Sequence, residues 1–219
     1  MSGKTVFVAG GTGLIGQAVR KQLAADSSIE KVFVLSRRKL DSLHAKEQLI
    51  EFDFENWHQI QLDQTPDWVI CTLGTTIKKA GSQAAFTKVD DEYVRHLADL
   101  AAKWNSSFGV ISSIGATANT SNFYLRTKGE MEQYVQSLNL KQMVILRPSL
   151  LLGDREEFRL GEKVGEVLSK LLSPLLFGSL KKYKPVYDRE VAHALIAKLK
   201  AAQPGVDIVE SDQIKALNQ

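Results

Sequence analysis

A tyrosine and a lysine one helical turn apart have the clearest capacity for chemistry in this sequence. Tyr124 and Lys128 are four positions apart, so on a helix they lie on the same face and reach the same space. A tyrosine hydroxyl is a weak acid with a reference pKa of about 10, but a neighbouring ammonium group favours the phenolate. The pair therefore indicates general acid-base chemistry at a tyrosine oxygen.

Hydroxyl groups precede this pair along the chain. Residues 110–113 read Val-Ile-Ser-Ser, so an apolar strand ends in two serines. Ser113 is our candidate to hold a substrate carbonyl while Tyr124 delivers the proton, and Ser112 is the alternative. A tyrosine four residues before a lysine is common by chance and usually reflects packing beside a solvated charge. The order of the motifs along the chain is what supports the chemical interpretation.

Glycines recur at every third position near the N-terminus, between an apolar stretch and a helical pattern. Gly10 permits a turn closed to bulkier residues, Gly13 lets the main chain approach a pyrophosphate, and Gly16 lets helix and strand pack closely. Free N–H groups at the start of the helix would face the phosphates. The motif predicts a dinucleotide site in preference to a glycine-rich turn without a ligand.

The end of the second strand distinguishes the two nicotinamide cofactors. An acidic residue there hydrogen-bonds the ribose 2′-hydroxyl of NAD, but residues 34–38 read Val-Leu-Ser-Arg-Arg. Ser36 and Arg37 could bind a 2′-phosphate, and Arg37 or Arg38 could lie over the adenine face. The absence of an acidic residue and the presence of basic residues favour a site for NADP(H). The alternative is that the basic residues form a solvated loop without a ligand.

Apolar stretches of strand length alternate with longer stretches of helical period, which is typical of a doubly wound parallel α/β sheet, the Rossmann fold. We expect strands at residues 5–9, 31–36, 48–52, 68–73, 108–112, 143–146 and 206–209. We expect helices at residues 14–25, 92–104, 124–138, 165–172 and 189–200. Ligands of such sheets bind beyond the carboxyl ends of the strands, where the strand order reverses, so the site is expected there.

Length and composition suit one soluble globular domain of 219 residues, with 44% hydrophobic and 24% charged residues. Within it, the pattern is irregular from Gly153 to Pro185, and residues 153–190 are predicted to form the substrate pocket. A net charge of +3 does not favour a nucleic-acid partner. No stretch reaches membrane-spanning length and no secretory signal is visible, while the single cysteine, Cys71, suits a reducing cytoplasmic setting. The four histidines are scattered, so no metal site is predicted.

The motifs in this order resemble those of the atypical short-chain dehydrogenase/reductases, over nearly the whole chain. More particular segments are similar to the Tat-interacting-protein-like branch of that family. They are Leu73-Gly74-Thr75-Thr76, Val89-Asp90, residues 112–116 and 121–130, and Arg147-Pro148 leading to residues 153–155.

The resemblance implies hydride transfer between NADP(H) and a carbonyl or alcohol carbon of a small-molecule substrate. It implies that the pyrophosphate is held by Gly10, Thr12, Gly13, Leu14 and Ile15. The other implied cofactor contacts are Ser36 and Arg37 at the 2′-phosphate, Asp53 and Phe54 at the adenine, Leu73, Gly74 and Thr75 beneath the cofactor, Lys128 at the nicotinamide ribose, and Pro148 and Ser149 at the carboxamide end.

Two departures from the common pattern of the family leave a rival open. Residues 73–75 replace the usual Asn-Ala-Gly, and Asp90 stands where the classical tetrad has asparagine. The rival is an NADPH-binding regulator or sensor with little or no turnover, and a third alternative is an interaction protein that needs no nucleotide. The apolar residues 167–178 could line a pocket for a partly apolar substrate, meet a protein partner, or simply cover the sheet.

Overall fold

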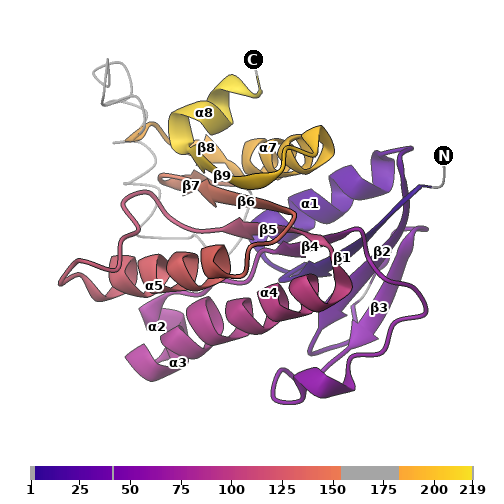
Figure 1. Ribbon diagram of the computed structural model, residues 1–219, viewed down its shortest axis with the longest axis horizontal. Coiled ribbons are helices and arrows are strands. Elements are labelled where there is room, and N and C mark those ends of the chain that lie inside the picture. The colour runs from indigo at the N-terminus through magenta and orange to yellow at the C-terminus, as the bar shows by residue number, and fades with distance from the viewer. Residues whose placement is uncertain (1–2, 41, 154–182, 219) are drawn as a thin grey trace.

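Seven parallel strands form the central sheet, in the order β3-β2-β1-β4-β5-β6-β9 (Figure 1). The computed structural model describes residues 3–40, 42–153 and 183–218. The strands are β1 (Lys4–Ala9), β2 (Ile29–Ser36), β3 (Glu47–Glu51), β4 (Trp68–Cys71), β5 (Ser107–Ile111), β6 (Gln142–Arg147) and β9 (Gly205–Glu210). The chain moves outward from β1 to β3 and returns to β4 on the other side of β1. The order therefore reverses between β1 and β4, as the predicted Rossmann fold requires.

Helices cover both faces of the sheet (Figure 1). They are α1 (Leu14–Ala25), α2 (Ile77–Ala80), α3 (Gln83–Thr87), α4 (Tyr93–Trp104), α5 (Phe123–Ser137), α7 (Asp188–Ala201) and α8 (Ser211–Ala216), with a 3₁₀ turn η1 (Trp57–Gln59) and a π-helical turn η2 (Lys88–Glu92) that leads into α4. Asparagines mark two of the boundaries. Asn122 begins α5 by accepting a hydrogen bond from the Leu125 N–H, and Asn105 ends α4 in the left-handed conformation.

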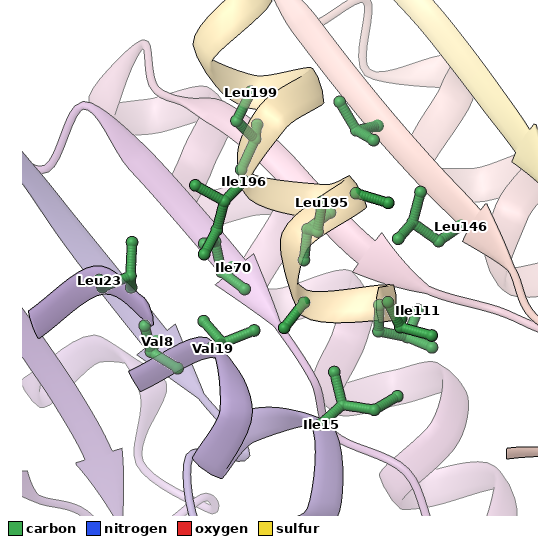
Figure 2. Packing of buried hydrophobic residues seen from close by; sticks show 14 of the residues in the cluster. Val8, Ile15, Val19, Leu23, Ile70, Ile111, Leu146, Leu195, Ile196 and Leu199 are labelled. Carbon is green, nitrogen blue, oxygen red and sulfur yellow. The ribbon is translucent and has the colours of Figure 1, made fainter. Parts of the chain in front are cut away.

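Alternate residues of the central strands enter two different hydrophobic layers. Val6 and Val8 of β1 pack with α1 and α7, whereas Phe7 and Ala9 pack with α4 and α5. Figure 2 shows the first layer, to which the two helices contribute Ile15, Val19, Leu23, Leu195, Ile196 and Leu199. Because both faces are covered, the strands are nearly continuous runs of apolar residues, and their carboxyl ends are held in fixed positions.

The predicted strands and the long helices within the described residues are confirmed, with boundaries that differ by no more than a residue or two. The predicted strand 68–73 ends early, because the chain leaves β4 after Cys71 to pass beside Gly10. The short elements α2, α3, η2 and α8, and the pair β7 (Leu151–Leu152) and β8 (Val186–Tyr187), were not predicted.

Several predictions lie outside the described residues: the helix at 165–172, the apolar run 167–178, and most of the predicted pocket region 153–190. Across the described ranges, no helix has the length and apolar character needed to cross a membrane. In the same ranges, no three His, Cys, Asp or Glu side chains gather closely enough to hold a metal ion.

Candidate functional site

The glycine loop joins β1 to α1 and packs closely against neighbouring main chain at Gly10 and Gly16. Gly10 has a φ of +83°, and a Cβ there would lie 2.5 Å from the carbonyl carbon of Thr72. A Cβ on Gly16 would lie 2.1 Å from the carbonyl oxygen of Gly10. Gly13 is the N-cap of α1 and contributes no side-chain hydrogen bond, so no side chain competes for the first N–H groups of the helix. The loop is therefore shaped for close approach of an anionic ligand.

The first two residues of α1 have different surroundings. Leu14 packs against Gly153, where a Cβ would come within 2.6 Å of its side chain. The Ile15 side chain points into the hydrophobic layer of Figure 2, so only its main chain lies at the start of the helix. The predicted pyrophosphate contacts of both residues would therefore be made by their main chains.

A cavity of about 440 Å³ opens beside the glycine loop, a volume usual for small-molecule sites. It is lined by Gly10, Thr12, Leu35, Ser36, Arg37, Arg38, Lys39, Leu40, Phe54 and Leu73. The structure thus brings the glycine loop, the predicted 2′-phosphate residues, Phe54 and Leu73 to one cavity. Lys39 and Leu40 also line it and were not predicted. Among the described lining residues three are cationic and none is acidic, which suits a phosphorylated ligand.

Ser36 shapes the turn that carries the cationic residues. Its hydroxyl donates to the Arg38 carbonyl oxygen at 2.8 Å and accepts from the Arg38 N–H at 3.3 Å. Asp53, in contrast, is not among the lining residues. Its exposed carboxylate accepts hydrogen bonds from the Glu55 N–H and the Asn56 side-chain amide, so it organises the turn after β3. Its predicted contact with adenine stays a prediction.

A buried ion pair joins the helix of the tyrosine to the turn η2, and through it to the loop after β4. The Lys128 ammonium lies 2.7 Å from Asp90 Oδ1, with side-chain exposures of 4% and 1%. The other oxygen, Asp90 Oδ2, accepts a hydrogen bond from the Thr75 N–H at 2.8 Å, and Gly74 lies against the same carboxylate. Burial opposes the charge of Lys128, but attraction to Asp90 and Tyr124 and the hydrogen bond to Asp90 outweigh burial and raise its pKa. Lys128 is therefore charged and held in one place.

Tyr124 lies one turn before Lys128 on α5 and is half-buried. Its ring is tilted against that of Phe86 on α3, with centroids 5.6 Å apart. Phe86 is fully buried, so it provides a rigid wall that orients the tyrosine. Phe86 was not predicted from the sequence, because a single phenylalanine in a short helix has no periodic signal.

The two serines after β5 have unequal surroundings. Ser112 is 4% exposed, and within the described part of the chain its hydroxyl has no hydrogen-bond partner. Ser113 is half-buried, and its hydroxyl donates a long hydrogen bond, 3.5 Å, to the Ile114 carbonyl oxygen. A buried unpaired hydroxyl costs about 1–3 kcal/mol, so Ser112 would gain from a polar ligand. Both serines stay candidates for holding a substrate oxygen.

Close packing fixes the serine loop to α5. A Cβ on Gly129 would lie 2.1 Å from the carbonyl carbon of Thr117, so only glycine allows this approach. The Thr117 N–H also donates to the Leu125 carbonyl oxygen at 3.1 Å. Gly129 was visible in the sequence only as part of a motif, and the structure supplies its physical reason.

Pro148 and Ser149 follow β6 and are tied into the protein. The Pro148 carbonyl oxygen accepts from the Ile114 N–H at 3.1 Å, which links this loop to the serine loop. The Ser149 hydroxyl donates to the Lys184 carbonyl oxygen and accepts from the Ser211 hydroxyl at 2.9 Å. The Ser149 side chain is thus engaged within the protein, and its predicted cofactor contact is untested.

Arg147, the last residue of β6, anchors α5 from the other side. It binds both carboxylate oxygens of Glu132 on α5 and, at 3.0 Å, the carboxylate of Glu210 on β9. The Glu132 side chain is only 3% exposed, so this network fixes the helix that carries Tyr124 to the carboxyl end of the sheet.

A second buried ion pair lies beneath the glycine loop. Arg20 of α1 binds both oxygens of Glu47 at 2.7 Å, and the Glu47 side chain is fully buried. Burial opposes ionisation of Glu47, but hydrogen bonds from Arg20 and from the His44 N–H outweigh it and lower the pKa of Glu47 below its usual 4.5.

The lowered pKa of Glu47 predicts an acid-sensitive contribution to stability. A carboxylate with a lowered pKa in the folded state stabilises the fold above its unfolded value, and that contribution is lost as the pH falls through the folded value. We expect Glu47→Gln to lower the free energy of unfolding by about 1–3 kcal/mol at pH 7. The difference from the unsubstituted protein should shrink below pH 4.5 in urea unfolding series. A difference that persists unchanged at acid pH would contradict this assignment.

Together the reversed strand order, the glycine loop at the start of α1 and the cationic cavity define a dinucleotide-binding α/β protein of the doubly wound class. The chain belongs to the NAD dependent epimerase/dehydratase family, whose model matches residues 6–209. The nicotinamide cofactor of this family fits the residues present, because α1 offers N–H donors at its start and the cavity lining is cationic.

Two relatives place the chain more narrowly. It is 34% identical over 216 residues to Protein FMP52, mitochondrial, of Eremothecium gossypii, with 96% of each chain covered. It is 36% identical over 167 residues to Protein HTATIP2 of Rattus norvegicus, covering 74% of this chain and 69% of that protein. The predicted resemblance to atypical, Tat-interacting-protein-like short-chain dehydrogenase/reductases is thereby confirmed.

Solved structures confirm the fold. The ADP-L-glycero-D-manno-heptose-6-epimerase of Helicobacter pylori superposes with a TM-score of 0.70 at 19% identity, covering 99% of this chain and 82% of that one. A dTDP-4-dehydrorhamnose reductase from Bacillus anthracis, in complex with NADP, gives 0.68 at 15% identity, covering 96% and 75%. At these identities the likeness concerns the architecture of the chain alone.

Proposed function

We propose that this protein is an NADP(H)-dependent oxidoreductase that moves hydride to or from a carbonyl or alcohol carbon of a small molecule. The observation that carries the choice of cofactor is the cavity lining after β2, where Arg37, Arg38 and Lys39 stand and no described lining residue is acidic. A 2′-phosphate suits this charge, whereas NAD-binding sites present a carboxylate at the same point. The start of α1 would hold the pyrophosphate.

The acid-base work falls to residues on α5 and after β5. When bound, the nicotinamide donates or accepts the hydride. In the direction of reduction, the Tyr124 hydroxyl donates its proton to the substrate oxygen, which Ser113 or Ser112 holds by a hydrogen bond. Lys128 supplies positive charge one turn away and would also reach the nicotinamide ribose. Because Asp90 pairs with Lys128, part of that charge is offset before it acts on Tyr124.

Binding measurements test the cofactor preference. We expect the protein to bind NADPH at least about tenfold more tightly than NADH, since a charge-assisted pair with phosphate contributes on the order of 1.5–3 kcal/mol. Arg37→Ala should remove most of that preference in fluorescence titrations. Lys198→Ala, which removes a surface ion pair on α7, is the control and should leave both affinities unchanged. Equal or tighter binding of NADH by the unsubstituted protein would overturn the preference.

The second candidate is an NADPH-binding regulator or sensor that has little or no turnover and acts by contacting a protein partner. The Asp90 carboxylate favours this function, since it binds the Lys128 ammonium that would activate Tyr124. NADPH fluorescence with a panel of aldehydes, ketones and quinones separates the two functions. Consumption of NADPH with any class identifies the enzyme, whereas tight binding without consumption identifies the sensor. The enzyme is our first choice because Tyr124, Lys128 and two serines are all present.

We further propose a small, partly apolar substrate and a cytoplasmic location. The sequence supports this location through its single cysteine, and burial raises the pKa of the Cys71 thiol to about 12, so that thiol is unreactive. Six fungal relatives are named mitochondrial. Subcellular fractionation decides between the two compartments, and recovery in the mitochondrial fraction would refute our choice.

A further inference from the structure

Arg20 touches both segments that border the cofactor cavity. Its Nη1 donates to the Gly11 carbonyl oxygen at 3.4 Å, and its Nη2 donates to the Ser42 carbonyl oxygen at 3.2 Å. The aliphatic part of the side chain lies against the glycine loop, because a Cβ on Gly11 would come within 2.9 Å of Arg20 Cδ. One buried side chain therefore links the glycine loop to the segment that follows β2.

Glu47 completes the link from the start of β3. One of its oxygens accepts from Arg20 Nε, and the other accepts both from Arg20 Nη2 and from the His44 N–H at 2.8 Å. The side-chain exposures of Arg20 and Glu47 are 10% and 0%, so water does not compete for these contacts. The far end of the connection between β2 and β3 is thus fixed at Ser42, His44 and Glu47.

Residues 36–40 line the cavity at the near end of this same connection. Three of them carry exposed cationic side chains, Arg37, Arg38 and Lys39, while Arg20 and Glu47 are not among the lining residues. A segment that is already fixed loses less conformational entropy when a ligand binds to it. A 2′-phosphate would bind the cationic side chains of this segment, whereas NADH lacks that phosphate and would depend less on the segment.

We propose that the ion pair of Arg20 and Glu47 positions residues 36–40 against the glycine loop and thereby sets the preference for a 2′-phosphorylated adenine dinucleotide. This inference rests on the proposed preference for NADP(H). Arg20 and Glu47 are positioning residues, because they act through the backbone of the two segments. The energetic signature is a change in the ratio of the two cofactor affinities.

The double variant Arg20→Met, Glu47→Leu tests the proposal. Replacing both members of a buried ion pair by apolar residues of similar volume is often neutral or stabilising, so the variant is expected to fold. It lacks the links from Arg20 to Gly11 and Ser42 and from Glu47 to His44. We expect the Kd for NADPH to rise about tenfold and the Kd for NADH by less than about threefold, measured by fluorescence titration.

Two further variants keep the test decisive. Leu199→Ala creates a cavity in the hydrophobic core beneath α7, so it should lower stability while leaving the ratio of the two Kd values unchanged. Arg20→Lys keeps the charge but loses the bidentate contact with Glu47, so it should also reduce the ratio of the Kd for NADH to the Kd for NADPH. It takes the place of the double variant if that variant does not fold. A folded variant at these positions with an unchanged ratio overturns the inference alone. Absence of an NADPH preference in the unsubstituted protein overturns the proposed function and the inference with it.

Discussion

Replacing Tyr124 by phenylalanine should lower kcat by about 10²- to 10⁴-fold and leave the Kd for NADPH nearly unchanged. The substitution removes the hydroxyl that transfers the proton but keeps the ring, which packs against Phe86 with centroids 5.6 Å apart. Turnover is measured as NADPH oxidation with any substrate found in the carbonyl panel, and binding is measured by NADPH fluorescence. A loss of turnover without a loss of binding would assign Tyr124 to the chemical step.

Tyr134→Phe is a matched control on the same helix. The Tyr134 hydroxyl donates to the Asp99 carboxylate at 2.8 Å, toward α4, and takes no part in the proposed chemistry. This variant should retain most of the kcat, which excludes a general sensitivity of α5 to the loss of a tyrosine hydroxyl. If Tyr124→Phe retains the turnover of the unsubstituted protein, Tyr124 is not the proton donor.

Replacing Asp90 by alanine should lower the free energy of unfolding by about 3–5 kcal/mol, because it leaves the Lys128 ammonium buried without its charge partner. The variant also removes the acceptor of the Thr75 N–H, so the loop after β4 loses its attachment to α5. Urea unfolding at neutral pH measures the change. A loss smaller than about 1 kcal/mol would show that water or another group replaces the carboxylate.

The pH dependence of this difference has a definite sign. Asp90 raises the pKa of Lys128 in the folded state, so the stabilisation is present below the usual 10.5 and is lost as the pH rises through the raised value. The gap between the unsubstituted protein and Asp90→Ala should therefore stay constant near neutral pH and narrow at strongly alkaline pH. Asp90→Asn keeps an acceptor for Thr75 and should lose less stability than Asp90→Ala.

The fold was predictable because its signals are local and repeated. The central strands β1, β4, β5 and β6 are nearly continuous apolar runs, and the long helices between them have a helical apolar period. The elements that were missed are short: α2, α3 and α8 each span six residues or fewer, too few for a helical period to stand out. The boundary of β4 was misjudged because Thr72 and Leu73 are as apolar or β-prone as a strand, although they already belong to the loop.

The site was predictable only where its residues are neighbours in sequence or follow a strand. Tyr124 and Lys128 share one helix, and Ser36 and Arg37 adjoin β2, so both pairs could be assigned from spacing. Contacts between distant residues could not be assigned in this way. Asp90 was noticed as a departure from a pattern, but its pairing with Lys128 depends on how two helices pack, and no local signal encodes that.

The ion pairs of Arg20 and of Arg147 also join residues that are distant in sequence. Arg20 and Glu47 are 27 positions apart, and Arg147 and Glu210 are 63 apart, so each contact forms only when the sheet is complete. Single charged residues inside apolar patterns gave no indication of their partners. Ser149 shows the opposite case, since its expected role followed from a motif while its hydroxyl is engaged with Ser211.

Two adjacent carboxylates in the π-helical turn η2 bind different partners. Asp90 binds Lys128 on α5, while Asp91 binds Arg95 on the next turn, and both are buried. A π turn contains one residue more than an α-helical turn, so its length sets the directions of the side chains on either side of it. Deleting one residue from this turn would rotate the preceding helix residues by about 100° and carry Asp90 away from Lys128 in one step. The buried pair of Asp90 and Lys128 therefore depends on the length of this turn as well as on the two residues themselves.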